Sequence, residues 1–168
     1  MIGAASAKPL QQICRIQSAT KGSTALIARH RRRSAFSSIV MASSREVIST
    51  ENAPGAVGPY SQAIKANGMV YVSGQVALVP GTKEFASPDV AGQTEQVMAN
   101  LGAILSAAGT SFDKVVKTTI LLADMSDFGT VNEIYGKYFP ENPPARATFA
   151  VKGLPLGAKV EIDAVALE

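Results

Sequence analysis

Cysteine and histidine each occur once in this sequence of 168 residues, as Cys14 and His30, and tryptophan does not occur. From Arg45 onward the chain therefore has no thiol nucleophile, no imidazole base and no Cys or His ligand for a metal. Histidine triads, zinc sites, redox dithiols and disulfides are excluded there. Any chemistry in this part must use carboxylates, hydroxyls, amides, arginine, lysine or ordered water.

Acidic residues are absent before Glu46, whereas basic residues and Ser, Thr and Ala are frequent. The basic residues of this segment are Lys8, Arg15, Lys21, Arg29, Arg31, Arg32 and Arg33. An arginine-rich segment without acids is typical of a plastid or mitochondrial transit peptide. We expect residues 1–44 to be a transit peptide that is removed in the chloroplast, with the mitochondrion as the alternative.

Two other interpretations of this segment remain open. It could be a disordered basic tail that binds nucleic acid or anionic lipid. Met41, which precedes Ala42, could also serve as an internal start and give a cytosolic form.

The charge of the remaining chain has the opposite sign. Subtracting the seven basic residues from the 16 Lys and Arg leaves nine, and 9 − 13 gives a net charge of −4. No apolar run approaches the ~18 residues that span a bilayer. Residues 45–168 are thus expected to form one mildly acidic domain that binds neither nucleic acid nor membrane.

The pattern of apolar residues predicts strands and two helices. Residues 69–80 predict a strand, a break at Gly74 and a second strand, and residues 115–122 predict another. Ser87 as N-cap and Pro88 predict the start of a helix that Gly109 closes. A second helix is expected after Asp124 or Ser126, stopped at Pro140.

The last two strands, residues 146–151 and 159–168, are joined by a turn at 155–157. Strands mixed with two helices indicate an α+β or α/β layer. Alternation predicts that Phe149 faces the core and Arg146 the other side, and that Glu161 lies on the second face of its strand with Val165. Because that face carries apolar residues, we expect another subunit to cover it. If the strands are neighbours, Arg146 and Glu161 share this face.

Five segments, in this order and spacing, resemble the RidA branch of the Rid (YjgF) family of reactive intermediate deaminases. They are ENAPGAVGPYSQAI (51–64), YVSGQ (71–75), TVNEIYGKYFP (130–140), PPARAT (143–148) and LPLGAKVEIDAVA (154–166). The resemblance covers residues 45–168. It implies a chorismate-mutase-like α+β fold, a mixed sheet packed by two helices, assembled as a homotrimer with active sites at the subunit clefts.

The resemblance also implies an activity: hydrolysis of 2-imino acids or their enamine tautomers to 2-keto acids and ammonia, without cofactor or metal. Enzymes such as threonine dehydratase, in isoleucine biosynthesis, release these imines. Catalysis is assigned to Arg146, which would grip the substrate carboxylate, and to Glu161, which would activate water. The substrate-binding residues carried over are Tyr60, Ser73, Gly74, Asn132, Arg146 and Thr148. Many relatives have cysteine in place of Thr148, and we infer that this thiol is dispensable.

Each assignment has a structural alternative. Arg146 could form an ion pair with Glu161 or Asp163, and Glu161 could be a solvated strand carboxylate. Tyr60 could be an ordinary turn residue, Ser73 a residue at the end of a strand, and Asn132 a residue on the surface of a helix. Two other functions also remain: a trimer that binds 2-keto acids without turnover, and a ribonuclease that inhibits translation.

Overall fold

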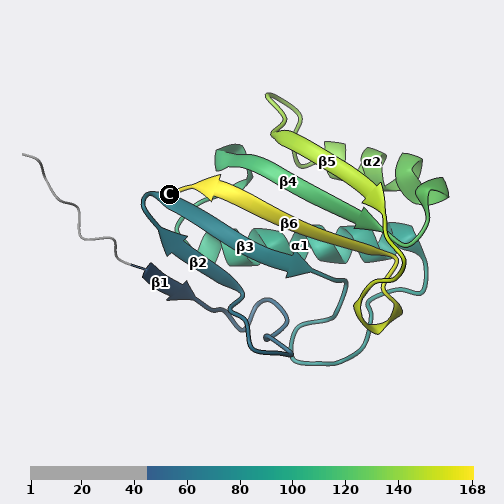
Figure 1. Cartoon of the computed structure of the whole chain (residues 1–168), viewed down its shortest axis with the longest axis horizontal. Helices are drawn as coiled ribbons and strands as arrows, with labels where there is room; N and C mark the ends of the chain where they lie inside the picture. Colours follow the sequence, from purple (N-terminus) through teal and green to yellow (C-terminus); the bar gives the residue numbers. More distant parts are fainter. Residues whose placement is uncertain (1–44) are drawn as a thin grey trace, which may run out of the picture. The chain divides into compact units, whose positions relative to one another are not determined.

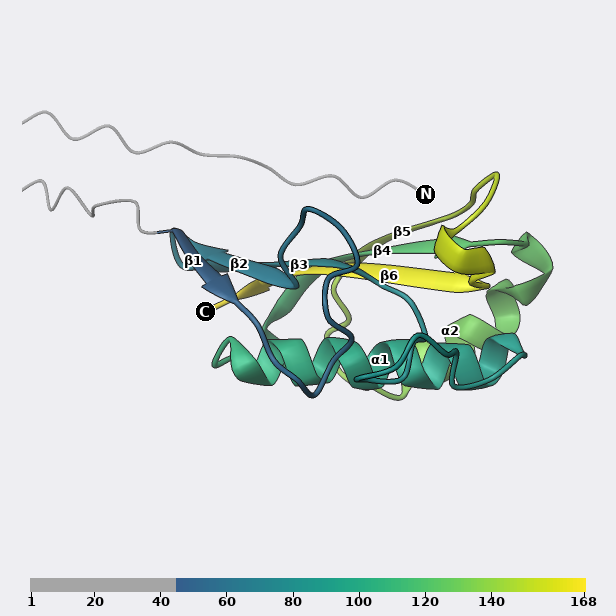
Figure 2. The same ribbon diagram turned by 90° about the horizontal axis from the view of Figure 1, so that it is seen from below.

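The computed structural model describes residues 45–168, and the expected transit peptide 1–44 lies outside the described residues. Residues 45–168 form a six-stranded mixed sheet in the order β1-β2-β3-β6-β4-β5, with two α-helices (Figure 1). Both helices lie on the same face of the sheet (Figure 2). The predicted α+β class, a mixed sheet packed by two helices, is confirmed.

The elements have the following bounds. The strands are β1 (Arg45–Ile48), β2 (Ala63–Ala66), β3 (Met69–Gln75), β4 (Val115–Leu122), β5 (Ala145–Ala150) and β6 (Val160–Leu167). The helices are α1 (Val90–Ala107) and α2 (Phe128–Gly136), and short 3-10 turns are η1 (Phe112–Lys114), η2 (Met125–Asp127) and η3 (Pro155–Gly157). Among the strands of residues 45–168, β4 and β5 alone pair in parallel.

The core lies between the sheet and α1. Alternate residues of β6 are buried, as predicted: Val160, Ile162, Ala164 and Ala166 are at most 1% exposed. One side of α1 is equally buried, with Val97, Leu101, Ile104 and Leu105 at 0%. Apolar residues recur every two positions in a strand and every 3.6 positions in a helix, so each element has one apolar side. Burial of these apolar sides against each other packs α1 on the sheet.

The start of α1 differs from the prediction. Asp89, not Ser87, is the N-cap, because its Oδ1 accepts a hydrogen bond from the Gly92 N–H (2.9 Å). Ser87 supports the cap, since its Oγ donates to Asp89 Oδ2. The predicted end is confirmed: Gly109 follows the helix with a φ of 78°, which glycine adopts readily. Asp124 caps the η2 turn that leads into α2 by accepting from Ser126 N–H.

The prediction of a second strand after Gly74 is wrong. Beyond Gln75 the chain runs as irregular backbone, with one isolated bridge between Leu78 and Phe85. The pairing of β3 with β6 shifts register between Val72 and Gln75, so the chain leaves the sheet at this bulge. Strands β1 and β2 were not predicted, because four residues each is too short for a clear alternation.

The prediction of which side of β5 faces the core is also wrong. Arg146 pairs with Thr118, and Thr118 is fully buried beneath the helices. Residues paired in register point to the same side of a sheet, so Arg146 and Thr148 lie on the helix side. Phe149, 51% exposed, lies on the other face. The alternation was right, but the assumption that the aromatic residue marks the core was not.

No helix of residues 45–168 covers the sheet face opposite α1 and α2 (Figure 2). One row of partners crosses all six strands there: Val47, Ile64, Tyr71, Val165, Lys117 and Ala145. Val47 is 54% and Tyr71 48% exposed. Val47, Ile64, Tyr71 and Val165 form an unbroken apolar part of this row, which ends at Lys117. Apolar side chains gathered on an exposed face are the usual signature of a surface that another protein covers.

Candidate functional site

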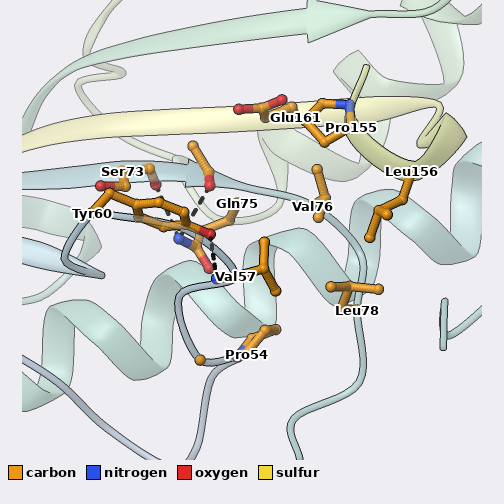
Figure 3. A pocket seen from close by; sticks show the side chains of 12 residues that line it. Pro54, Val57, Tyr60, Ser73, Gln75, Val76, Leu78, Pro155, Leu156 and Glu161 are labelled. Carbon is orange, nitrogen blue, oxygen red and sulfur yellow. Dashed lines mark hydrogen bonds between the residues drawn. The ribbon is translucent and has the colours of Figure 1, made fainter. Parts of the chain in front are cut away.

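A cavity of about 280 Å³ lies at the end of β3, next to the start of β6. We call it the Glu161 cavity. Its walls are the segment around residues 54–60, the chain from Ser73 to Leu78, and the η3 turn. Figure 3 shows the Glu161 carboxylate above the end of β3, with Tyr60 and Ser73 to one side and Val76 and Leu156 to the other. Tyr60, Ser73, Gly74 and Glu161, which the family resemblance assigned to the site, all line this cavity.

Gly74 makes room for the carboxylate. A Cβ at position 74 would come within 2.0 Å of Glu161 Oε1, far inside van der Waals contact. No larger residue fits without displacing Glu161. The glycine in the SGQ segment thus has a steric role in this site, in addition to marking the bulge.

Burial raises the pKa of Glu161 above its ordinary value, and the negative charge of Asp163 raises this pKa further. The single ion pair found among residues 45–168 joins Lys65 to Glu168, so no cation offsets this effect. A carboxylate with a raised pKa is a stronger base than an exposed one. The arrangement suits Glu161 to accept a proton from water.

Two hydroxyl groups of the cavity are already engaged with backbone groups. Ser73 Oγ donates to the carbonyl of Ser61 (2.7 Å), which leaves its lone pairs free to accept. Tyr60 Oη accepts from the Val57 N–H (3.3 Å), and its ring remains 46% exposed. Both residues therefore hold the wall of the cavity together and still present polar atoms to it.

Arg146 lies in a second hollow, of about 460 Å³, which we call the Arg146 cleft. Its other lining residues are Asn132, Tyr135, Gly136, Phe139, Pro143 and Pro144. The guanidinium donates to Asn132 Oδ1 (2.8 Å) and lies over the rings of Tyr135 (5.1 Å) and Phe128 (5.7 Å). These contacts fix the plane of the guanidinium without neutralising its charge.

No carboxylate pairs with Arg146 among residues 45–168, so the ion-pair alternative with Glu161 or Asp163 is wrong. Asn132 accepts from one of the five N–H donors of the Arg146 guanidinium, and Arg146 is exposed. The remaining donors are free for a planar anion from outside the chain. Beneath them, burial raises the pKa of Tyr135, whose Oη is hydrogen-bonded to Thr118 Oγ1 (2.9 Å).

The two hollows do not meet within one chain. Strand β4 lies between β5 and β6, and Arg146 and Glu161 point to opposite faces of the sheet. Arg146 is level with Thr118 and Glu161 with Leu121, so ideal sheet spacings separate their Cα atoms by about 14 Å. The expectation that they share a face as neighbouring strands is therefore wrong for a single chain.

Thr148 is not brought to either hollow. Its Oγ1 is buried without a hydrogen-bond partner, which is uncommon for a hydroxyl. In the described part of the chain, no cluster of three or more His, Cys, Asp or Glu side chains could hold a metal ion. No helix there is long and apolar enough to cross a membrane.

Sequence reasoning missed several residues of the two hollows. Leu156 lines the Glu161 cavity with a φ of 58°, a region rare for a branched side chain, and is 65% exposed. Phe128 and Tyr135 fall within the predicted second helix, and both lie under Arg146. The density of Gly and Pro around residues 54–59 and 153–157 was the available signal, since irregular loops often form sites.

Comparisons with known proteins agree with this arrangement. A family model described as Endoribonuclease L-PSP matches residues 50–168. The chain is 59% identical over 122 residues to "Reactive Intermediate Deaminase A, chloroplastic" of Arabidopsis thaliana, covering 73% of this chain and 65% of that protein, slightly under two thirds of its length. It is 52% identical to human "2-iminobutanoate/2-iminopropanoate deaminase", covering 74% of this chain and 90% of that protein.

A solved structure from Yersinia pestis, described as a protein of the conserved Rid family, is 47% identical and has a TM-score of 0.72. The superposition covers 74% of this chain and all of that one. The family match spans most of the sequence, and the sequence identities far exceed 30%. The chain therefore belongs to the Endoribonuclease L-PSP family, within the Rid group of reactive intermediate deaminases.

Proposed function

We propose that this protein hydrolyses 2-imino acids and their enamine tautomers, among them 2-iminobutanoate and 2-iminopropanoate, to 2-keto acids and ammonia. The names of the human and Arabidopsis relatives give this activity. The structural observation that carries the proposal is Arg146, a charged fork oriented by Asn132 and two rings but paired with no carboxylate. No cofactor is part of the proposal.

Arg146 is the proposed anchor of the substrate carboxylate. A carboxylate accepts two parallel charge-assisted hydrogen bonds from a guanidinium, an arrangement that lysine cannot reproduce. Asn132 and the Tyr135 ring hold the fork in one orientation before the substrate arrives, which lowers the entropy lost on binding.

The active site is proposed to form between two copies of the chain in a homotrimer. A four-carbon imino acid is too short to reach both Arg146 and Glu161 of one chain. The Arg146 cleft of one subunit and the Glu161 cavity of the next would together enclose it. The uncovered apolar face of the sheet supports this assembly, because association would remove it from water.

Glu161 is the proposed base. It would accept a proton from water as the water oxygen bonds to the imine carbon, while the imine nitrogen takes up a proton from solvent, which gives a carbinolamine. Glu161 would then return its proton to the nitrogen as the carbon–nitrogen bond breaks, and the hydroxyl proton would pass to solvent as the carbonyl forms, releasing ammonia and the 2-keto acid. The overall balance is imino acid plus water to keto acid plus ammonia. Ser73 Oγ, already donating to Ser61, could only accept from the substrate N–H.

A second candidate function comes from the family description, which names an endoribonuclease. Residues 45–168 carry a net charge of −4 and lack the histidine that commonly serves in acid–base cleavage of RNA. We therefore rank it second. Salt-sensitive cleavage of RNA by this segment, lost on substitution of Glu161, would reverse the order.

We propose that residues 1–44 direct the protein to the chloroplast and are then removed. In the chloroplast the remaining protein would hydrolyse imines released during branched-chain amino-acid synthesis. The support is the basic, acid-free composition and the chloroplastic Arabidopsis relative. Import of a reporter fused to residues 1–44 into isolated chloroplasts tests this. Import into mitochondria alone would contradict it.

The activity itself is tested by generating 2-iminobutanoate or 2-iminopropanoate with an amino-acid oxidase and trapping the remaining imine with semicarbazide. Residues 45–168 should reduce semicarbazone formation in proportion to their concentration. Binding of 2-keto acids without any faster loss of imine would instead establish a ligand-binding protein without turnover.

Arg146→Lys should lower kcat/KM about 10- to 100-fold, because one charge remains but a charge-assisted hydrogen bond is lost. The assembly should be unaffected. Arg45→Lys, the same substitution at the other arginine of residues 45–168, should leave kcat/KM unchanged. Wild-type kcat/KM in Arg146→Lys would remove the anchor assignment.

Glu161→Gln should lower kcat by roughly 100-fold or more, as expected on loss of a general base. It should also stabilise the fold near neutral pH. A raised folded-state pKa means that the ionised group opposes folding, so this gain should vanish as the pH falls and Glu161 becomes protonated.

Asp163→Asn is the matched control on the same strand face. Its amide oxygen can still accept from the Thr119 N–H, so the fold should persist. Removing its charge should lower the pKa of Glu161 and move the acid limb of the kcat profile to lower pH. Unchanged kcat in Glu161→Gln, or an acid limb that moves upward in Asp163→Asn, would contradict the role of Glu161.

A further inference from the structure

Three irregular segments form the walls of the Glu161 cavity: residues 54–60, residues 76–78 and the η3 turn. Apart from the bridge between Leu78 and Phe85, the backbone of these segments lies outside strand pairing, so most of its N–H and C=O groups have no partner in a sheet. Backbone groups of this kind need other partners, and the choice of partner decides where the segment lies. Buried amide side chains that do not themselves line the cavity bond to the first two segments and to Lys159, two residues after the η3 turn.

Gln62 ties down the approach to the first segment. It is 4% exposed and uses both ends of its amide. Its Oε1 accepts from the Thr50 N–H (2.7 Å), and its Nε2 lies within hydrogen-bond distance of the carbonyls of Thr50 (3.0 Å), Ala53 (3.3 Å) and Pro54 (2.8 Å). The segment that leads through Pro54 to Tyr60 is thereby fixed against the start of β2.

Asn100 ties down the second segment from α1. It is 1% exposed, and its Nδ2 donates to the carbonyls of Val76 (3.2 Å) and Leu78 (3.0 Å). Its Oδ1 accepts from Gln96 (2.8 Å), which fixes the amide orientation. The chain beyond the Gly74 bulge, which has only one isolated bridge, is therefore also held on the helix by a side chain.

Gln93, also on α1, ties down the chain that follows the η3 turn. It is 3% exposed, accepts from the Lys159 N–H (2.8 Å) and donates to the Ser87 carbonyl (3.0 Å). Pro155 and Leu156, which line the cavity, belong to this short 3-10 turn and to no α-helix or strand.

We propose that Gln62 and Asn100, assisted by Gln93, are positioning residues for substrate binding in the Glu161 cavity. They act through the backbone of the walls and do not touch the substrate. A buried amide that lost its partners would carry a large desolvation cost, so each one allows a single wall geometry. The inference rests on the proposed function, since it assigns these walls to the same imino acid.

The proposal predicts a particular kinetic pattern. Glu161 lies on strand β6 and not on the irregular segments. Greater mobility of these segments should therefore leave the Glu161 carboxylate in place and weaken the binding of the substrate. Gln62→Met, which keeps the length of the side chain but loses its hydrogen bonds, should raise KM roughly tenfold with little change in kcat. A variant that is merely less stable should lose active protein, and hence apparent kcat, at an unchanged KM.

The test combines kinetics with hydrogen exchange of residues 45–168. In Gln62→Met, amides of residues 50–60 should exchange faster, while those of α1 should not. Two controls match the loss of stability: Thr94→Val removes a buried hydrogen bond within α1, and Val97→Ala opens the core. Both should leave KM and the exchange of residues 50–60 unchanged.

Asn100→Leu extends the test to residues 76–78 and replaces the first variant if Gln62→Met does not fold. Unchanged KM together with unchanged local exchange would overturn the proposal, as would an equal rise of KM in the two controls. Failure of the proposed function has a different signature: the wild-type segment would not consume imines, while the exchange measurements would still report whether the amides hold the walls.

Discussion

The position of β4 between β5 and β6 determines where chemistry can take place in this protein. It separates Arg146 from Glu161 by two strand spacings, and the pleat turns the two side chains to opposite faces. Arg146, the proposed substrate anchor, and Glu161, the proposed base, therefore cannot serve one small substrate in one chain. A second copy of the chain is the simplest way to unite them, and the uncovered apolar face offers the surface for it.

Much of this could be predicted from the sequence, for identifiable physical reasons. Strand β4 follows from its β-branched residues, and the buried face of β6 follows from alternation. The end of α1 follows from the glycine at position 109. The residues of the Glu161 cavity came from the family resemblance, not from periodicity. The face of β5 could not be predicted, because its Phe149 would ordinarily mark the core, and only the position of α2 shows that Arg146 lies on the helix side.

The irregular walls of the cavity escaped prediction for a related reason. Their geometry depends on hydrogen bonds between residues far apart in the sequence, such as Asn100 with Leu78, and such pairs leave no local pattern. The same walls contain features that stability alone would not favour. Glu161 is half-buried without a cation, and Leu156 has an unfavourable φ. Strain and uncompensated charge gathered at one cavity are typical of a functional site.

The central claim is that each active site joins Arg146 of one subunit to Glu161 of another. Co-expression of Arg146→Lys and Glu161→Gln chains tests it directly. In a ring of three subunits, every mixed trimer then has one site with both native residues, so equal mixing should restore roughly a quarter of wild-type activity. Activity no higher than the average of the two separate variants would show that the two residues act within one chain, or that they do not act together.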